Sequence, residues 1–259
     1  MLCAREIRTF SETYRERRED EEPNQEQQFR GGVGDAHLNG DVQLGDFFEA
    51  VIQYSLTGNT EQGEFISCDS ETWESRVDEV TQAIEECFDN CSFTSLIDLL
   101  EAYDLEMYQA VRPHPATLDE LEDYWEDFFE SFPGTFNIGE GEWAREYDVP
   151  EYEQNLLFQE KAGVADRIIL RGRIDLILRV GPLTTIIEIK ATQKVNVEYK
   201  YQVMMYGMAV GDASLSICHN GNFQAVEQNS ENRIDTLLYN PAGVEYCPSC
   251  LLSGCPYKY

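Results

Sequence analysis

The sequence predicts an α/β fold, a mixed central sheet flanked by helices with a helical insertion ahead of the sheet. Three observations lead to this prediction. Apolar residues recur at helical spacing between residues 42 and 132, short β-prone runs follow between 143 and 190, and a Pro-free segment rich in Met, Tyr and Val covers 196–210. A chain of 259 residues has room for one large domain or for a core with a substantial insertion.

The first elements expected are helical. Charged side chains recur four residues apart over residues 4–20, which indicates a charged helix, and a polar linker follows from Pro23 to Gly34. Apolar residues at helical spacing predict an amphipathic helix from Val42 to Gly58. Further helices are expected over Trp73–Phe88, Thr94–Tyr108 and Leu118–Phe132. Pro133 and Gly134 then break the chain.

The sheet is expected in the second half of the chain. A β-meander is predicted over Trp143–Val149, Arg167–Leu170, Ile174–Val180 and Thr184–Lys190, followed by a crossing helix over Asn196–Val210 and closing strands at Leu215–Cys218 and Phe223–Val226. Gly181 and Pro182 supply a turn, so the strands on either side of it should be antiparallel neighbours. The predicted regions are an N-terminal helix and linker (1–40), an acidic helical insertion (41–140), the core (141–230) and a C-terminal cysteine cluster (231–259).

Two of these strands carry charged residues in apolar surroundings. Asp175 lies within the first, and Glu188 and Lys190 share one face of the next because they are two residues apart, whereas Ile187 and Ile189 point to the other face. An acid and a base on a buried strand cost free energy unless a partner satisfies them. Carboxylate oxygens suit Mg²⁺ or Mn²⁺, so a divalent cation is expected here.

The crossing helix adds an amide and a phenol one turn apart, Gln202 and Tyr206. The ordered series resembles the PD-(D/E)xK nuclease superfamily in its RecB-like branch, on the motifs Gly172-x-x-Asp175, Glu188-x-Lys190 and Gln202-x3-Tyr206. This resemblance implies a restriction-endonuclease-like core and hydrolysis of phosphodiester bonds.

The roles expected of these residues follow the chemistry of that reaction. Asp175, Glu188 and the backbone carbonyl of Ile189 are expected to hold the metal ion. Lys190 is expected to orient or deprotonate the attacking water, or to offset developing negative charge. Gln202 and Tyr206 are expected to position Lys190 or the scissile phosphate.

Cysteines at the two ends of the chain narrow the resemblance. The residues that carry it are Cys3, Cys247, Cys250 and Cys255. One early and three late cysteines around such a core resemble the CRISPR-associated RecB-like iron-sulfur exonucleases, with the helicase-nuclease AddB as a relative. This resemblance implies a [4Fe-4S] cluster on the four cysteines and exonuclease activity on single-stranded DNA, often from the 5′ end. Zinc is the rival metal, since Cys-x2-Cys pairs often bind it. The other cysteines, Cys68, Cys87, Cys91 and Cys218, are expected to be buried small hydrophobic residues, although Cys87-x3-Cys91 could complete a second metal site or replace Cys3 as the fourth ligand.

The same family has an early histidine that follows a glycine and acts as an additional metal ligand. His37 is the matching residue here, although its glycine spacing departs from the family pattern, and an imidazole ligand would favour Mn²⁺. His114 lies between two prolines, where a rigid extended turn is expected, and His219 opens a His-Asn-Gly turn, so local structure explains both better than metal binding does.

The net charge of −30 is unusual for a nucleic-acid enzyme. Its distribution accounts for part of this, because residues 161–200 hold eight Lys or Arg against four acids, whereas residues 41–160 hold 3 Arg against 31 acids. With five lysines against 14 arginines, the composition resembles that of halophile proteins, whose charges are screened by molar salt. The alternative is an acidic partner-binding insertion.

The expected partner is single-stranded DNA, with CRISPR adaptation or replication and repair proteins as possible associates. The chain shows no apolar run near 18 residues and no signal peptide, so no membrane contact and a cytoplasmic location are expected. A competing hypothesis is a nucleic-acid-binding or adaptation-complex subunit in which partner docking dominates and nuclease activity is secondary. A helicase-associated role lacks support because the chain holds no Gly-x4-Gly-Lys-Ser/Thr phosphate loop.

Overall fold

The computed structural model describes residues 40–132, 138–149, 152–155, 167–170, 172–192, 195 and 197–227. The helix and linker predicted before residue 40, His37 and the four predicted cluster cysteines lie outside these residues. No helix within the described ranges is long and apolar enough to cross a membrane.

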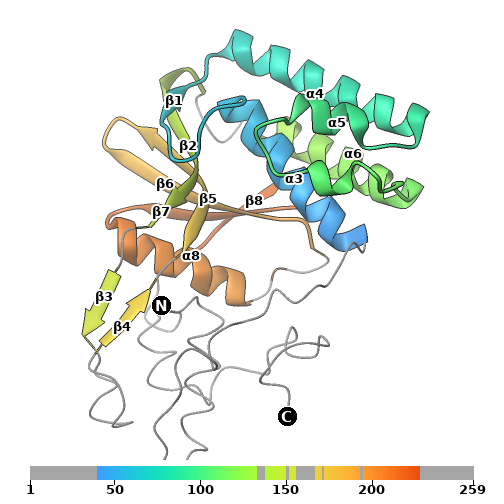
Figure 1. Ribbon diagram of the computed structural model, residues 1–259. Helices are drawn as coiled ribbons and strands as arrows, with labels where there is room; N and C mark the ends of the chain where they lie inside the picture. Colours follow the sequence, from blue (N-terminus) through green and yellow to red (C-terminus); the bar gives the residue numbers. More distant parts are fainter. Residues whose placement is uncertain are drawn as a thin grey trace, which may run out of the picture.

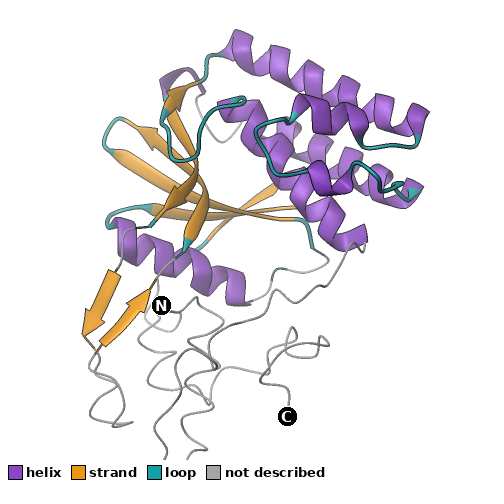
Figure 2. Cartoon of the chain, in the orientation of Figure 1, coloured by secondary structure: helices purple, strands orange, loops and turns teal. Residues whose placement is uncertain are grey.

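Within the described residues, six strands form one mixed sheet flanked by helices, as the sequence predicts (Figures 1 and 2). In spatial order they are β1 (Ile66–Ser67), β2 (Glu142–Asp148), β5 (Arg173–Val180), β6 (Leu183–Lys190), β7 (Ser214–His219) and β8 (Asn222–Ala225). All neighbouring pairs are antiparallel except β6 and β7. β6 and β7 are parallel because α8 (Val197–Val210) connects them and returns the chain to the end of the sheet at which β6 began.

The predicted β-meander is wrong at one strand. The segment Arg167–Leu170 (β4) pairs with Tyr152–Asn155 (β3) in a separate two-stranded ribbon, and β2 pairs directly with β5. A strand has two hydrogen-bonding edges, and β2 and β6 already occupy both edges of β5. The segment 167–170 therefore cannot enter the sheet beside β5.

The helices before the sheet are α3 (Gly40–Thr57), α4 (Ser70–Asn90), α5 (Thr94–Leu99) and α6 (Pro115–Ser131), with short 3₁₀ turns at Glu106–Tyr108 and Ile138–Glu140. Asp69 caps α4 by accepting a hydrogen bond from the Thr72 backbone N–H at 2.8 Å. His114 caps α6 in the same way, with Pro115 in the first turn, so the extended conformation expected of His114 is confirmed.

The helix predicted over Thr94–Tyr108 is too long, since α5 ends at Leu99. Tertiary contacts explain the early end. The Tyr103 hydroxyl donates to the Gly58 carbonyl at 3.1 Å, and the Arg145 guanidinium stacks 4.1 Å from the Tyr103 ring centroid. These contacts draw Tyr103 inward, where it is buried, and a continuous helix would not place it there.

Two hydrophobic clusters cover the two faces of the sheet. One joins α3–α6 to the sheet residues Trp143, Leu176, Leu178, Ile187 and Ile189, and the other joins α8 to Ala144, Ile177, Ile186 and Ile217. The predicted orientation of Ile187 and Ile189 is therefore confirmed. By strand alternation Glu188 shares the face of Ile186, which α8 covers.

Candidate functional site

The site forms at Asp175, where the ladder between β5 and β6 ends and the ladder between β5 and β2 is interrupted. The ladder between β5 and β6 begins at the pair Leu176–Ile187, and Asp175 takes part neither in it nor in the ladder with β2. Instead, the Asp175 Oδ2 atom accepts a hydrogen bond from the Ile189 backbone N–H at 2.7 Å. The carboxylate thus occupies the position of a ladder partner, which fixes it at the point where the strands open.

Lys190 brings the predicted acids together. Its Nζ atom lies 2.5 Å from Glu188 Oε1 and 3.8 Å from Asp175 Oδ2. The Glu188 side chain is 0% exposed, its Oε1 atom contacts Lys190 Nζ, and its Oε2 atom has no hydrogen-bond partner among the described residues. A buried carboxylate with an unsatisfied oxygen is costly unless a further cation or donor completes it.

The pKa values of the three groups reflect this crowding. Burial raises the pKa of Glu188 to about 8, the negative charge of Asp175 adds to the rise, and Lys190 opposes it. Burial also raises the pKa of Asp175, against the opposing effects of Lys190 and the Ile189 N–H. For Lys190, burial lowers the pKa, but Asp175 and Glu188 outweigh it and the pKa is raised overall. Burial therefore destabilises the ionised forms of Asp175 and Glu188, and a divalent cation would stabilise these forms.

A third carboxyl group comes from α3 and was missed in the sequence. Burial raises the pKa of Glu49 well above its usual range, and the charge of Asp175 adds to the effect. Gln53 Nε2 donates to Glu49 Oε1 and to the Asp175 backbone carbonyl, both at 3.2 Å. A signal was present, because Glu49 and Gln53 are polar residues one turn apart in the apolar segment 47–54.

An exposed ion pair borders the site. Glu146 of β2 pairs with the Arg173 guanidinium, and Arg173 is 51% exposed. Glu146 has a backbone φ of 44°, in the left-handed region, and it is the residue omitted from the ladder between β2 and β5 on the β2 side. The local break in pairing at Asp175 therefore extends to β2, and it places the Arg173–Glu146 ion pair beside the buried carboxylates.

The motif residues of α8 lie against the same region. Gln202 Nε2 donates to the Tyr206 hydroxyl at 2.9 Å, in keeping with their spacing of one turn. A Cβ atom added to Gly172 would lie 2.2 Å from Tyr206 Cε1, so the glycine of the Gly-x-x-Asp motif leaves the space that the ring fills. Tyr199, which sequence reasoning did not single out, places its ring centroid 5.5 Å from Lys190 Nζ.

The metal ligands predicted from the sequence are only partly within the described residues. Asp175, Glu188 and Ile189 lie together, whereas His37 falls outside the described ranges. Among the described residues no group of three or more His, Cys, Asp or Glu side chains is arranged to hold a metal ion. Lys190 Nζ is the cation next to Glu188 and Asp175 in this arrangement. The Glu188 Oε2 atom, which has no partner among the described residues, nevertheless fits a hard divalent cation.

The cysteines of the described region match most of the expectation. Cys68, Cys87 and Cys218 are buried and free, as small hydrophobic residues are, whereas Cys91 is free but exposed. Cys91 lies at the end of α4 in the left-handed conformation, which places it at the surface and explains the difference.

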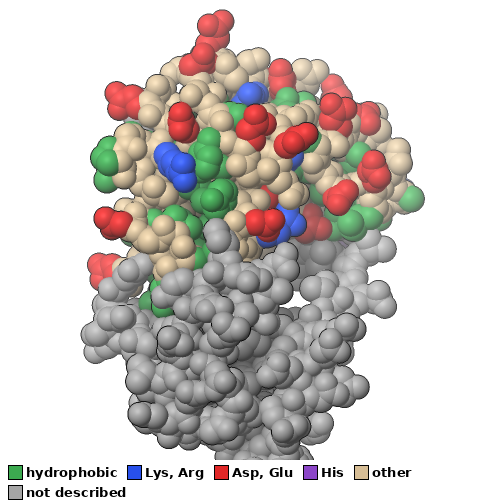
Figure 3. Space-filling view, turned by 60° about the vertical axis from the view of Figure 1, so that its left-hand side comes forward, with side chains coloured by type: hydrophobic (Ala, Val, Ile, Leu, Met, Phe, Trp, Pro, Cys, Tyr) green, Lys and Arg blue, Asp and Glu red, His purple; other side chains and the backbone are tan. Residues whose placement is uncertain are grey.

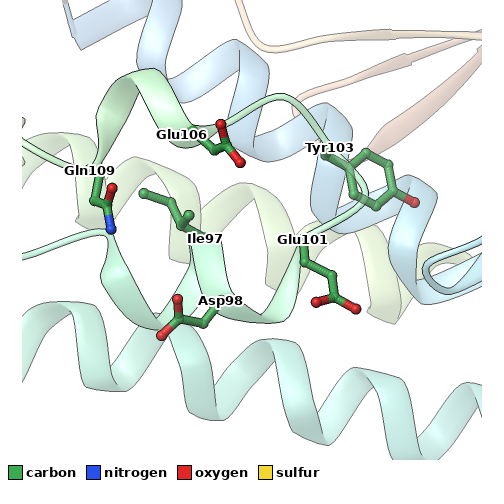
Figure 4. Close-up of a pocket in the computed structure, with 6 residues that line it drawn as sticks. All are labelled: Ile97, Asp98, Glu101, Tyr103, Glu106 and Gln109. Carbon is green, nitrogen blue, oxygen red and sulfur yellow. The ribbon is translucent and has the colours of Figure 1, made fainter.

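A surface hollow of about 610 Å³ lies elsewhere, beside α5 and the turn that follows it (Figure 4). Its lining residues are Ile97, Asp98, Glu101, Tyr103, Glu106 and Gln109. None of them belongs to the group around Asp175, Glu188 and Lys190, so this hollow is separate from the candidate site.

Comparisons with known proteins do not assign a family. No family model matches the chain, and no curated protein matches it. A solved structure described as "Crystal structure of SSO0001" aligns with 81% of this chain and 95% of its own, at 13% identity and a TM-score of 0.30. A similarity this low supports no inference about function.

Proposed function

We propose that this protein is a metal-dependent nuclease with a PD-(D/E)xK core that hydrolyses phosphodiester bonds, acting as an exonuclease on single-stranded DNA. The observation that carries the proposal is Glu188, a fully buried carboxylate whose Oε2 atom has no partner among the described residues, held with Asp175 around Lys190 where β5 and β6 part. A purely structural sheet has no need of two buried acids and one lysine at a break in its ladder.

Asp175, Glu188 and the Ile189 carbonyl are the groups that would hold Mg²⁺ or Mn²⁺, with Glu49 as a further carboxylate facing them. Such an ion supplies an acidified water and polarises the phosphoryl oxygen. Lys190, already held between the two acids, would orient the attacking water or offset the charge that develops on the phosphate. Gln202 and Tyr206 would position the scissile phosphate or Lys190.

The charge distribution is compatible with this proposal. Acidic side chains are spread widely over the described part of the face seen in Figure 3, and they belong to a protein of net charge −30. Residues 161–200 reverse this balance, and the exposed Arg173 lies in that stretch next to the site. A nucleic-acid backbone would therefore be repelled by the acidic helices, and Arg173 would contact it in competition with Glu146.

The choice of single-stranded DNA, the exonuclease polarity and the second metal centre rest on the family resemblance. We propose a [4Fe-4S] cluster on Cys3, Cys247, Cys250 and Cys255, with zinc as the rival occupant. Roles in CRISPR adaptation, DNA repair or viral replication are each consistent with such an enzyme.

The decisive experiment is cleavage of 5′- and 3′-labelled single strands with Mg²⁺ or Mn²⁺. Asp175→Asn, Glu188→Gln and Lys190→Met should each lower cleavage by at least about 100-fold, the order of magnitude for loss of one transition-state contact. Asp175→Asn and Glu188→Gln keep side-chain size and remove a buried negative charge, so neither should lower the melting temperature, whereas Lys190→Met leaves both acids without their counterion and should lower it. Glu142→Gln, an exposed change on β2, is the matched control and should cleave at the wild-type rate. Full activity in Asp175→Asn would refute the nuclease assignment.

A further inference from the structure

Gln53 is a buried polar residue on α3 that belongs to none of the nuclease motifs. Its side chain is 1% exposed, and its neighbours Val51 and Ile52 are fully buried apolar residues. Its Nε2 atom nevertheless makes two hydrogen bonds at 3.2 Å, one to the Asp175 backbone carbonyl and one to Glu49 Oε1. A buried amide in an apolar helix is retained only when its hydrogen bonds are satisfied.

The break in the sheet explains why Asp175 needs this donor. Asp175 is absent from the ladders on both sides of β5, so it is paired with no residue of β2 or β6. Gln53 supplies a hydrogen bond to this carbonyl from α3, across 122 positions of the sequence. The same amide thus ties the helix to the strand at the residue that carries the site's first carboxylate.

The second bond of the amide fixes Glu49. Glu49 and Gln53 are four residues apart on α3 and so lie on the same face of the helix. Because one amide group binds both the Glu49 carboxylate and the Asp175 backbone, it sets the position of Glu49 relative to Asp175. Asp175 Oδ2 accepts a hydrogen bond from the Ile189 backbone N–H, so Gln53 is also connected to β6 through Asp175.

We propose that Gln53 is a positioning residue that holds the Glu49 carboxylate and Asp175 in the arrangement that binds a divalent cation. The proposal rests on the proposed nuclease function. Residues that hydrogen-bond to metal ligands and orient them contribute about 10–100-fold to metal affinity, although they do not contact the ion. Gln53 therefore acts through Glu49 and Asp175. Its replacement should reduce the free energy of metal binding more than it reduces the free energy of unfolding.

The test compares Mn²⁺ binding, measured by titration calorimetry, with the melting temperature of the metal-free full-length protein. Gln53→Met removes both hydrogen bonds but keeps size and helix propensity, and it should raise the Kd for Mn²⁺ by about 10–100-fold. Ser55→Ala is the matched control, because Ser55 is a fully buried residue of the same helix whose hydroxyl donates only to the local Ile52 carbonyl at 2.7 Å. It should leave the Kd within about 2-fold, whatever its effect on the melting temperature.

Glu49→Gln gives a second measurement that does not depend on how well Gln53→Met folds. It keeps the bond from Gln53 to Asp175 but removes the charge that Gln53 holds, so it should also raise the Kd for Mn²⁺. The loss in the Glu49→Gln/Gln53→Met double variant should be smaller than the two single losses combined, because Gln53 acts partly through Glu49.

The outcomes separate this inference from the proposed function. A wild-type protein that binds no Mn²⁺ would refute the proposed function. Wild-type binding with an unchanged Kd in Gln53→Met or in Glu49→Gln would refute the positioning role and leave the nuclease proposal standing. An equal loss in Ser55→Ala would also overturn it, since that would show a general loosening of α3.

Discussion

Replacement of Gly172 by alanine tests whether the motif glycine and the α8 tyrosine belong to one packed unit. The added Cβ would lie 2.2 Å from Tyr206 Cε1, 3.0 Å from Cζ and 3.1 Å from the hydroxyl oxygen, so the contact involves the side of the ring and not a flexible tip. Tyr206 is 3% exposed within the α8 cluster and has little room to move. Overpacking of this kind costs about 1–3 kcal/mol. A displaced ring would also disturb the 2.9 Å bond from Gln202 to the Tyr206 hydroxyl.

We therefore expect Gly172→Ala to lower the melting temperature, by about 2–4 °C for each kcal/mol in a chain of this size, and to reduce cleavage. Gly45→Ala is the matched control, since no heavy atom lies within 4 Å of the added Cβ and alanine favours the helix by about 1 kcal/mol. It should stabilise the protein. In a Tyr206→Ala background the clash is gone, so Gly172→Ala should have little further effect. A wild-type melting temperature in Gly172→Ala would refute this account of the packing.

Three further predictions concern pH, salt and the cysteines. The pKa of Glu188 rises on folding from its usual 4.5 to about 8, so the folded protein favours the protonated form of this side chain. The metal-free protein should therefore lose stability relative to Glu188→Gln as pH rises from about 4.5 to about 8. Melting temperatures of the two proteins that change in parallel across this pH range would contradict the shift. Because residues 41–160 hold 3 Arg against 31 acids, lowering KCl from molar to millimolar should lower the melting temperature, and a salt-independent melt would favour the partner-binding explanation of the acids. Protein purified without oxygen should be brown and contain iron, and Cys3→Ser should bleach and destabilise it, whereas colourless protein with stoichiometric zinc would exclude the cluster.

The sequence by itself was enough for features that depend on local periodicity. Alternation along β6 separated Ile187 and Ile189 from Glu188, and the structure places both isoleucines in the cluster on the α3–α6 side. The turn expected after His219 is present, with Asn220 and Gly221 both at positive φ, as a two-residue hairpin requires. Spacing also brought Asp175, Glu188 and Lys190 together, because adjacent antiparallel strands place such residues side by side.

Contacts between distant segments were decided only by the tertiary structure. The pairing of β4 with β3 depends on which edges of β5 are already occupied, and the early end of α5 depends on where Tyr103 is buried. Local propensity contains neither fact. Glu49 and Gln53 show the same limit, since they reach Asp175 across more than 120 positions of chain. The sequence shows that both are polar residues on one face of the helix. It does not show which strand that face contacts, because helical periodicity identifies only the residues that share a face.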